Sequence, residues 1–381
     1  MTTHPVKSVH VLSDDFQWLT PKHIEAVEKA ASNSDIIMFL VADADAHRSI
    51  VAPFTFEERS DLIKAAFSDF WNDDRIRIVD VPSQLYVATP YPYAFQAIDK
   101  ELEYLLDSPA QTEKGIPVTV QGYQMAIAEE FKPEWEYVED EIKDIDEQIT
   151  ALDNYILSDE PIGQGTAHGD LLDAFKRTEE FAELQHECND KHFILNNFGK
   201  GPFYTADAIC TIGDQVLLIS RKNPPYRHTL ATPGGLLDPN EDPLTAAARE
   251  LLEETEMRVP AFVLTGDTPT DDAEWVHVTL DFLKSRVMNS VPRKFVSKTR
   301  DPRGDYRANV FWFDLSDLPV TPKVKGMDDA EKANWVSKDG LTTSSMAFDH
   351  FAGLCALGVT EYPETIQEAR LKNEVTVAPT L

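Results

Sequence analysis

The sequence predicts an α/β protein with two domains, residues 1–190 and residues 200–381. A chain of 381 residues, 42% of them hydrophobic, is long enough to bury two cores of ordinary size. In the first half, short apolar runs alternate with helical patterns, which predicts a parallel, doubly wound sheet. In the second half, a hairpin pattern comes first, and a helix, further strands and a closing helix follow. That order predicts a mixed sheet flanked by helices.

The predicted elements of the first half alternate in type along the chain. Apolar runs predict strands at residues 9–12, 35–42, 75–81 and 118–121. Helical periodicity predicts helices at residues 21–31, with a proline in the first turn, and at residues 56–67, 136–157 and 171–188. We expect the last helix to bridge the two domains, with residues 196–202 as the joint.

The pattern changes from Tyr204 onward. Two strands, residues 206–212 and 215–220, are predicted to form a hairpin across Gly213 and Asp214, and an acidic helix follows. Later elements are expected as strands at residues 276–282 and 309–315, a closing helix at residues 345–356 and a frayed tail at residues 372–381.

Composition limits the classes of partner. A formal charge of −31 excludes a surface that tracks nucleic-acid phosphates and a surface that binds an anionic membrane, because both need clustered Lys and Arg. No apolar run reaches membrane length, and the first residues lack a signal-peptide core. The three cysteines are far apart in sequence and are expected to be reduced. We expect a soluble, cytoplasmic protein whose partners are small molecules.

The acidic helix carries the strongest chemical pattern. Glu250, Glu253 and Glu254 are three and four residues apart, so they share one helix face, while leucines and alanines form an apolar stripe opposite. Grouped carboxylates bind Mg²⁺, or alternatively Mn²⁺, because the cation relieves their mutual repulsion. The competing interpretation is a solvated acidic face in a chain this acidic.

The spacing around these acids is the second part of the pattern. Gly235, five residues, Glu241, seven residues and then Arg249-Glu250-Leu-Leu-Glu253-Glu254 resemble the Nudix hydrolase signature. The resemblance implies a Nudix fold and cleavage of a nucleoside diphosphate derivative at its pyrophosphate. It implies metal ligation by Gly235, Glu250, Glu253 and Glu254, and catalytic roles for Arg249, Glu250, Glu253 and Glu254.

Three positions of this pattern can also be interpreted from the residues alone. Arg249 is four residues from Glu253, so it forms either an orienting ion pair or an ordinary surface salt bridge. Glu241 is expected to brace the loop. Glu256 stands where the family has glycine. A non-glycine residue in the left-handed conformation of such a helix cap costs about 1 kcal/mol.

The flanks of this region narrow the resemblance. Residues 300–304, 321–336 and 348–351 resemble the C-terminal part of bifunctional nicotinamide-mononucleotide adenylyltransferase/Nudix proteins, whose Nudix half is typically an ADP-ribose pyrophosphatase. The resemblance implies ADP-ribose as substrate, with Arg303 on a substrate-side loop. Glu331, with its neighbouring aspartates, either places a carboxylate near substrate and metal or belongs to a solvated acidic turn.

The first half has its own partial match to these proteins. Thr20-Pro21-Lys22-His23, preceded by Phe16-Gln17, and the segments 48–50 and 53–59 resemble the adenylyltransferase half. The resemblance implies a Rossmann-like nucleotidyltransferase domain in which Phe16, Gln17, Thr20, His23 and Arg48 bind substrate, namely ATP, nicotinamide mononucleotide or NAD. The second of these segments also predicts a helix start, with Thr55 as cap and Glu58 closing a capping box.

This half also departs from the family. Lys22 replaces a glycine, and in the second phosphate motif only Thr166 remains while Gly169 stands in the place of an arginine clamp. Residues 121–125 lack the polar run expected after a strand. The adenylyl-transfer site is therefore predicted to be degenerate.

Together these patterns predict a Mg²⁺-dependent hydrolase that cleaves ADP-ribose to AMP and ribose 5-phosphate. Two alternatives stay open. The chain is an active bifunctional enzyme that also makes NAD, or its first domain is a nucleotide sensor or an oligomerisation platform in a homo-oligomer.

Overall fold

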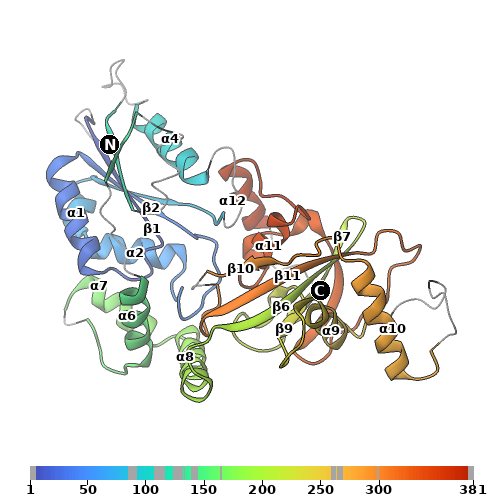
Figure 1. The fold of residues 1–381 in the computed structure, drawn as a ribbon. Helices are drawn as coiled ribbons and strands as arrows, with labels where there is room; N and C mark the ends of the chain where they lie inside the picture. The colour runs from blue at the N-terminus through green and yellow to red at the C-terminus, as the bar shows by residue number, and fades with distance from the viewer. Residues whose placement is uncertain are drawn as a thin grey trace. The chain divides into compact units, whose positions relative to one another are not determined.

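The computed structural model describes residues 6–84, 92–106, 116–122, 132, 134–138, 145–163, 165–258, 263, 269–297 and 300–375. The chain divides into two compact units (Figure 1). Of the described residues, the N-terminal unit holds those up to Cys188 together with Pro363–Arg370. The C-terminal unit holds Asn189–Tyr362 and the residues after Arg370.

The described strands of the N-terminal unit form one parallel sheet, in the order β3-β2-β1-β4-β5. The strands are β1 Val9–Asp14, β2 Ile36–Val41, β3 Ile76–Asp80, β4 Val118–Gly122 and β5 Glu136–Val138. The helices are α1 Pro21–Asn33, α2 Phe56–Ala66, α3 Ser68–Asn72, α4 Tyr93–Leu106, α6 Ile145–Leu157, α7 Ala167–Phe175 and α8 Glu179–Phe198, the last running past the end of this unit. The predicted doubly wound sheet is confirmed.

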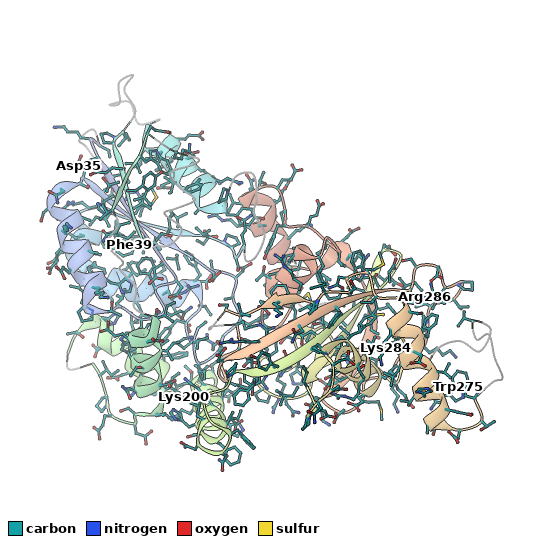
Figure 2. The ribbon with its side chains drawn as sticks, in the orientation of Figure 1. Asp35, Phe39, Lys200, Trp275, Lys284 and Arg286 are labelled. Carbon is teal, nitrogen blue, oxygen red and sulfur yellow. The ribbon has the colours of Figure 1, made fainter. Side chains whose placement is uncertain are left out.

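Both faces of this sheet are covered, which explains why β1 and β2 are buried at every position. Val11 and Met38 face one side, where they pack in a core with Ile98 of α4. Leu12 and Phe39 face the other side, in a core with α1 and α2. Figure 2 labels Phe39. Alternation along each strand thus serves two separate layers of helices.

The last part of the chain returns to the N-terminal unit. Helix α12, Ile366–Val375, begins in this return segment and adds Ile366 and Ala369 to the core beside α4. Arg370 fixes the segment, because its Nε donates to Asp80 Oδ2 at 2.7 Å and its Nη2 to the Asp80 carbonyl at 2.6 Å. The predicted domain ranges, residues 1–190 and 200–381, do not include this return to the N-terminal unit.

The C-terminal unit is built on a mixed sheet, with the order β10-β11-β6-β7-β12 and with β8 and β9 paired to β7 and β6. Its strands are β6 Phe203–Ile212, β7 Gln215–Arg221, β8 Leu230–Ala231, β9 Gly234–Leu236, β10 Arg293–Phe295, β11 Tyr306–Asp314 and β12 Ala330–Ser337. Its helices are α9 Pro243–Thr255, α10 Asp272–Ser285 and α11 His350–Ala356, with short 3₁₀ helices at Lys338–Gly340 and Thr343–Ser345. Among the described strands of this unit, β6 and β11 pair in parallel and the other pairs are antiparallel, so the predicted mixed sheet is confirmed.

The helices of this unit cover both faces of the sheet. Ala208 and Leu217 pack with α9 on one side, whereas Ile209 and Leu218 pack with α11 on the other. The predicted hairpin across Gly213 is present, with Ile212 paired to Gln215. The sheet is the frame on which α9 presents its acidic face.

The predicted strand at residues 276–282 is wrong, because these residues lie in α10. Apolar alternation suggested a strand, but Asp271 caps a helix by accepting the Glu274 N–H at 2.9 Å. Thr279 and Leu283, four residues apart, are the positions that the helix buries. Figure 2 labels Trp275 and Lys284 on this helix and Arg286 at its end. A helix with so narrow a buried stripe resembles a strand in a short window.

Three other boundaries are corrected. Residues 171–188 belong to two helices, α7 and α8, because Thr178 interrupts the run and its hydroxyl accepts the Phe181 N–H at 3.2 Å. Residues 136–138 are the edge strand β5, and the helix predicted there begins at Ile145, while residues 139–144 lie outside the described residues. The closing helix begins at His350, after a 3₁₀ turn and not at residue 345.

Candidate functional site

Helix α9 is positioned by its cap and its apolar face. Pro243 occupies the first turn, and the Asp242 side chain accepts the Thr245 N–H at 3.1 Å. Ala247 and Leu251 are fully buried against the sheet. Glu256 follows the helix in the left-handed conformation, with φ 47° and ψ 25°, and its N–H donates to the Leu252 carbonyl at 2.8 Å. The chain thus keeps the left-handed cap without glycine.

The three acids of this helix lie in different environments. Glu253 is about half exposed, at 49%, whereas Glu250 is largely covered and Glu254 is buried. Glu254 Oε2 accepts the Gly234 N–H at 3.0 Å, yet burial raises the pKa of Glu254 to about 8, with the charge of Glu250 adding to the effect. Burial also raises the pKa of Glu250, against the opposing effect of Arg249. Crowded, desolvated carboxylates of this kind favour a divalent cation.

Strand β9 faces these acids with backbone alone. A Cβ at Gly235 would lie 2.5 Å from Glu250 Oε1, and a Cβ at Gly234 would lie 2.6 Å from Asp207 Oδ1. Both distances are shorter than real Cβ contacts. Glycine is therefore required for the close approach of β9 to the carboxylates. Ligation by the Gly235 carbonyl stays a prediction, and the close approach is compatible with it.

Arg249 ties the acids to the loop before the helix. Its Nε and Nη2 donate to the Glu241 carboxylate at 3.0 and 2.9 Å, and its Nη1 donates to Glu250 and Glu253 at 2.8 Å each. Nη2 also donates to the Leu236 carbonyl at 3.1 Å. The hydrogen bonds with Glu241, first of all, raise the pKa of Arg249. The guanidinium therefore links loop, strand and helix, which is more than an ordinary surface pair does.

A buried charge network lies next to the glycines. Arg300 Nε and Nη2 donate to Asp349 at 3.0 and 2.9 Å, and Asp207 lies 3.6 Å from the same guanidinium. Burial raises the pKa of Asp207 to about 6 and lowers the pKa of His350 to about 3. His350 is therefore neutral, and its Nδ1 accepts the Thr232 N–H at 3.0 Å. Among these residues, Asp207 was detectable only as a carboxylate that interrupts an apolar strand.

The substrate residues predicted for this unit lie in two places. Arg303 is paired with Asp301 at 2.7 and 3.0 Å and stacks over Tyr306, 4.9 Å from the ring centroid. Phe348 lies 5.8 Å from Arg303 and 4.8 Å from the guanidinium of Arg221, which sequence reasoning missed. Burial lowers the pKa of Arg221, Arg303 lowers it further, and Glu254 is among the acids that oppose this.

Glu331 lies in a separate pocket of about 580 Å³ in the C-terminal unit. Its Oε2 is 2.7 Å from His228 Nδ1, and Lys222 and Arg227 also line the pocket. The Glu331 side chain is 43% exposed where it lines this open pocket, so the contact with substrate and the solvated acidic turn both stay predictions.

In the N-terminal unit, both ring nitrogens of His23 contact the protein. Nδ1 is 3.0 Å from the Thr20 backbone nitrogen and 2.9 Å from Thr20 Oγ1, and Nε2 is 2.9 Å from Asp14 Oδ2. Thr20, His23 and Asp14 are all buried. The imidazole thus closes the cap of α1, and its contact with a nucleotide stays a prediction.

The other predicted substrate residues of this unit are also held by internal contacts. Phe16 is in the left-handed conformation, at φ 50°, and its ring is 5.3 Å from those of His23 and Phe39. The Gln17 amide pairs with the Phe54 backbone in both directions, at 3.2 and 3.0 Å. Arg48 forms two hydrogen bonds with Glu58, at 2.9 and 3.2 Å.

The capping box of Thr55 and Glu58 is confirmed. Glu58 therefore serves the helix start and Arg48 at once.

Carboxylates surround the end of this parallel sheet. Asp14 and Asp15 end β1, and Asp43 and Asp45 follow β2. The buried guanidinium of Arg59 donates to the carbonyls of Asp15, Ala42 and Asp43 at 2.6, 2.9 and 3.1 Å. Burial lowers the pKa of Arg59, and these four aspartates oppose the shift. Negative charge thus lies where open parallel sheets bind nucleotide phosphates.

The degenerate second motif is closely packed. Thr166 caps α7 by accepting the Gly169 N–H at 3.1 Å. A Cβ at Gly169 would lie 2.5 Å from the Gly163 Cα, so an arginine does not fit there without backbone movement. The departures predicted at residues 123–125 lie outside the described residues.

Known proteins resemble this chain in sequence and in fold. The family model for the NUDIX domain matches residues 202–351. The ADP-ribose pyrophosphatase of Methanocaldococcus jannaschii is 28% identical over 179 residues, which cover 42% of this chain and 86% of that protein. The C-terminal unit therefore contains a Nudix hydrolase domain.

Two crystal structures cover nearly the whole chain. Both are of a bifunctional NMN adenylyltransferase/ADP ribose pyrophosphatase from Francisella tularensis. The one complexed with AMP and Mn ion has a TM-score of 0.67 and 22% identity and covers 93% of this chain and 99% of that chain. The other has a TM-score of 0.68, 20% identity and the same coverage. At this identity the similarity establishes the fold alone: a parallel sheet followed by the mixed sheet of the NUDIX domain. Within the described residues, none of the helices is long and apolar enough to cross a membrane.

The glycine of β9 provides a first test. We expect Gly235→Ala to lower the kcat/KM for pyrophosphate hydrolysis about 100-fold, because the added methyl displaces the Glu250 carboxylate. A displacement of about 1 Å at a reacting site lowers the rate by roughly this factor. Gly340→Ala is the matched control, since nothing lies within 4 Å of its Cβ position. Turnover with Mg²⁺ and Mn²⁺ affinity are measured for both. Parental values for Gly235→Ala would contradict the geometry.

The buried imidazole predicts a pH dependence. The pKa of His350 is lowered from 6.5 to about 3 in the folded chain, so the unfolded chain binds the extra proton first as the pH falls. The stability that neutral His350 contributes is complete above pH 6.5 and is lost progressively below it. Between pH 7 and about pH 5 the contribution of His350 to the free energy of unfolding should fall by about 2 kcal/mol. Asp207 and Glu254 act in the opposite direction, because their raised pKa values let the folded chain take up protons first, so the contribution of His350 is the difference between the parent and a variant without the imidazole.

His350→Asn is the comparison, because Asn Oδ1 can still accept the Thr232 N–H. Urea unfolding of both proteins across this pH range measures the difference. Equal slopes for the parent and the variant would show that His350 is not the group responsible.

Proposed function

We propose that the protein is a Mg²⁺-dependent hydrolase that cleaves ADP-ribose to AMP and ribose 5-phosphate, with Mn²⁺ as an alternative cation. The observation that carries the proposal is the position of Glu250, Glu253 and Glu254 on one face of α9, beside a β9 backbone where a Cβ at Gly235 would overlap the Glu250 carboxylate. The donors are hard oxygen atoms, which Mg²⁺ and Mn²⁺ prefer. The raised pKa of Glu254 supports a cation there, because a positive charge stabilises the ionised carboxylate.

The side chains have distinct parts in this reaction. Glu250, Glu253 and Glu254, with the carbonyl of Gly235, would hold the ion. When bound, such an ion polarises the phosphate oxygens and lowers the pKa of a water ligand. Arg249 fixes Glu250 and Glu253 relative to the loop, through its bonds to Glu241. We assign Arg221 and Arg303, which both lie close to the ring of Phe348, to the negative charge of the substrate.

Charge supports an anionic nucleotide as the substrate. A chain with a formal charge of −31 repels anions overall, so binding requires local cations or metal, and both arginines are near Phe348. The choice of ADP-ribose is supported by similarity. The Methanocaldococcus jannaschii protein is an ADP-ribose pyrophosphatase, and the Francisella tularensis protein is a bifunctional enzyme with that activity.

For the N-terminal unit we propose a nucleotidyltransferase fold without adenylyl transfer. Its four strand-end aspartates repel a triphosphate, and Gly169 leaves no room for an arginine clamp. A role as nucleotide sensor or oligomerisation platform, and a homo-oligomeric state, stay predictions. The cytoplasm is the proposed location, since all three cysteines are free thiols.

The metal ligands are tested by neutral isosteres. Glu253→Gln and Glu254→Gln should each lower kcat/KM for ADP-ribose more than about 100-fold, because loss of a ligand exceeds the loss of a supporting group. Glu361→Gln, an exposed glutamate of the same unit, is the control. Phosphate-bond cleavage is measured by resolving AMP and ribose 5-phosphate. Turnover within a few-fold of the parent for both ligand variants would end the proposal.

The absence of adenylyl transfer is tested with ATP. With millimolar ATP and nicotinamide mononucleotide, we expect no pyrophosphate release above the enzyme-free rate, because the phosphate site is acidic and lacks its clamp. ADP-ribose turnover by the same preparation shows that the protein is folded. Pyrophosphate release that disappears in His23→Ala would establish adenylyl transfer instead.

A further inference from the structure

The pocket that contains Glu331 is formed by two loops of the C-terminal unit. Residues 222–229 connect β7 to β8, and residues 326–329 lead into β12, whose first residues are Ala330 and Glu331. The Lys222 N–H donates to the Asp329 carbonyl at 3.0 Å, and Asn223 Nδ2 donates to Asp329 Oδ1 at 2.9 Å. These bonds hold the loops together around a volume of about 580 Å³, which is in the range of small-molecule sites.

The second loop is attached to the end of the acidic helix. The Lys325 N–H donates to the Thr255 carbonyl at 2.9 Å, and the Met327 N–H donates to the Glu254 carbonyl at 3.0 Å. Lys222 directly follows Arg221, whose pKa responds to the charge of Glu254. The pocket therefore adjoins the last turn of the helix that carries the proposed metal ligands.

The lining of the pocket is polar and charged. Lys222 and Arg227 supply cations, and the described residues show no ion-pair partner for Arg227. His228 and Glu331 form a pair at 2.7 Å, and Asp328 adds a further carboxylate. Apart from Met327 and Ala330, the side chains that line it carry hydrogen-bonding groups.

This set of groups fits a phosphorylated sugar better than a base. Sugar hydroxyls donate to carboxylates and accept from Lys, Arg and His, and phosphate takes charge-assisted bonds from Arg and Lys. None of the lining residues has a phenyl, phenol or indole ring on which a base could stack. Such rings lie elsewhere in the unit, where Tyr226 and Phe348 contact each other at 4.9 Å.

The backbone of the two loops is strained where it forms the pocket. His228 and Asp328 have φ values of 65° and 51°, and Tyr226 beside them has 62°. Non-glycine residues with positive φ are uncommon and gather at ligand sites. The backbone strain agrees with a binding role. The charged groups that line the pocket, and not the strain, indicate which ligand it binds.

We propose that this pocket binds the ribosyl-phosphate half of the substrate. Lys222 and Arg227 bind its anionic end, and His228, Glu331 and Asp328 bind the ring hydroxyls. The proposal rests on the proposed hydrolysis of ADP-ribose. It also explains a preference for ADP-ribose over NAD and dinucleoside polyphosphates. In those molecules the corresponding half carries a base, and this pocket has no phenyl, phenol or indole ring against which a base could stack.

Ribose 5-phosphate and AMP serve as separate probes of the two halves. Calorimetry with Mg²⁺ measures both for the full chain and for Arg227→Ala and Glu331→Gln. Each variant should weaken ribose 5-phosphate binding about tenfold or more, the effect of one charged hydrogen bond, while AMP binding stays within about twofold. Lys323→Ala, an exposed lysine outside the pocket, should change neither.

Turnover of ADP-ribose and of NAD is a second measurement that tests the pocket assignment. In Arg227→Ala the kcat/KM for ADP-ribose should fall about tenfold or more, while the kcat/KM for NAD should not fall. The ratio of the two values, which measures the preference for ADP-ribose, should therefore decrease. Weakened AMP binding with unchanged ribose 5-phosphate binding would overturn the assignment, as would unchanged binding of both.

The two proposals fail separately. If the parent protein does not cleave ADP-ribose, the proposed function fails. Binding of ribose 5-phosphate that depends on Arg227 would still support the pocket assignment, and absence of that binding would remove it as well.

Discussion

Glu250 and Glu254 lie close to the sheet of the C-terminal unit where β9 has two consecutive glycines. Gly234 and Gly235 bring the β9 backbone so close that a Cβ would overlap the carboxylates of Asp207 and Glu250. The Gly234 N–H is used by Glu254. Asp207, Glu250 and Glu254 thus share one desolvated region, and burial raises the pKa of each. Desolvation of this kind is costly unless positive charge enters, so the geometry itself favours a cation.

Arginines control the charge around this region, each at a different depth. Arg249 joins Glu241, Glu250 and Glu253 at the edge of the acidic face. Arg300 is almost completely buried and balances Asp349 and Asp207. A buried charge pair contributes little net stability, but removing one partner is costly, so such a network fixes a local arrangement more than it stabilises the fold. Together, the two arginines hold the acidic residues on both sides of β9 in place.

What the sequence could predict was local. The 3.6-residue period placed the three glutamates on one face of a helix, and short apolar runs located β1, β2, β6, β7 and β11. The network of Asp207, Arg300 and Asp349 escaped prediction because its members are 49 or more residues apart and meet only through the sheet. Helix α10 was missed because its cap and two buried positions are weaker signals than the alternation of its apolar residues. The return of α12 depends on Asp80, which lies 290 residues away.

For the N-terminal unit, a shared fold does not by itself establish a shared activity. Its parallel sheet, its capped α1 and the Thr20–His23 contact are features of the fold. Four carboxylates lie near the strand ends, and our proposal that this unit does not transfer adenylyl groups rests on them. Arg59, the guanidinium closest to them, is fully used by backbone carbonyls, and Asp14 takes the second nitrogen of His23. A triphosphate would have to displace these internal bonds while facing four carboxylates. The same interactions that stabilise this end of the sheet are therefore the basis of our proposal that this unit does not transfer adenylyl groups.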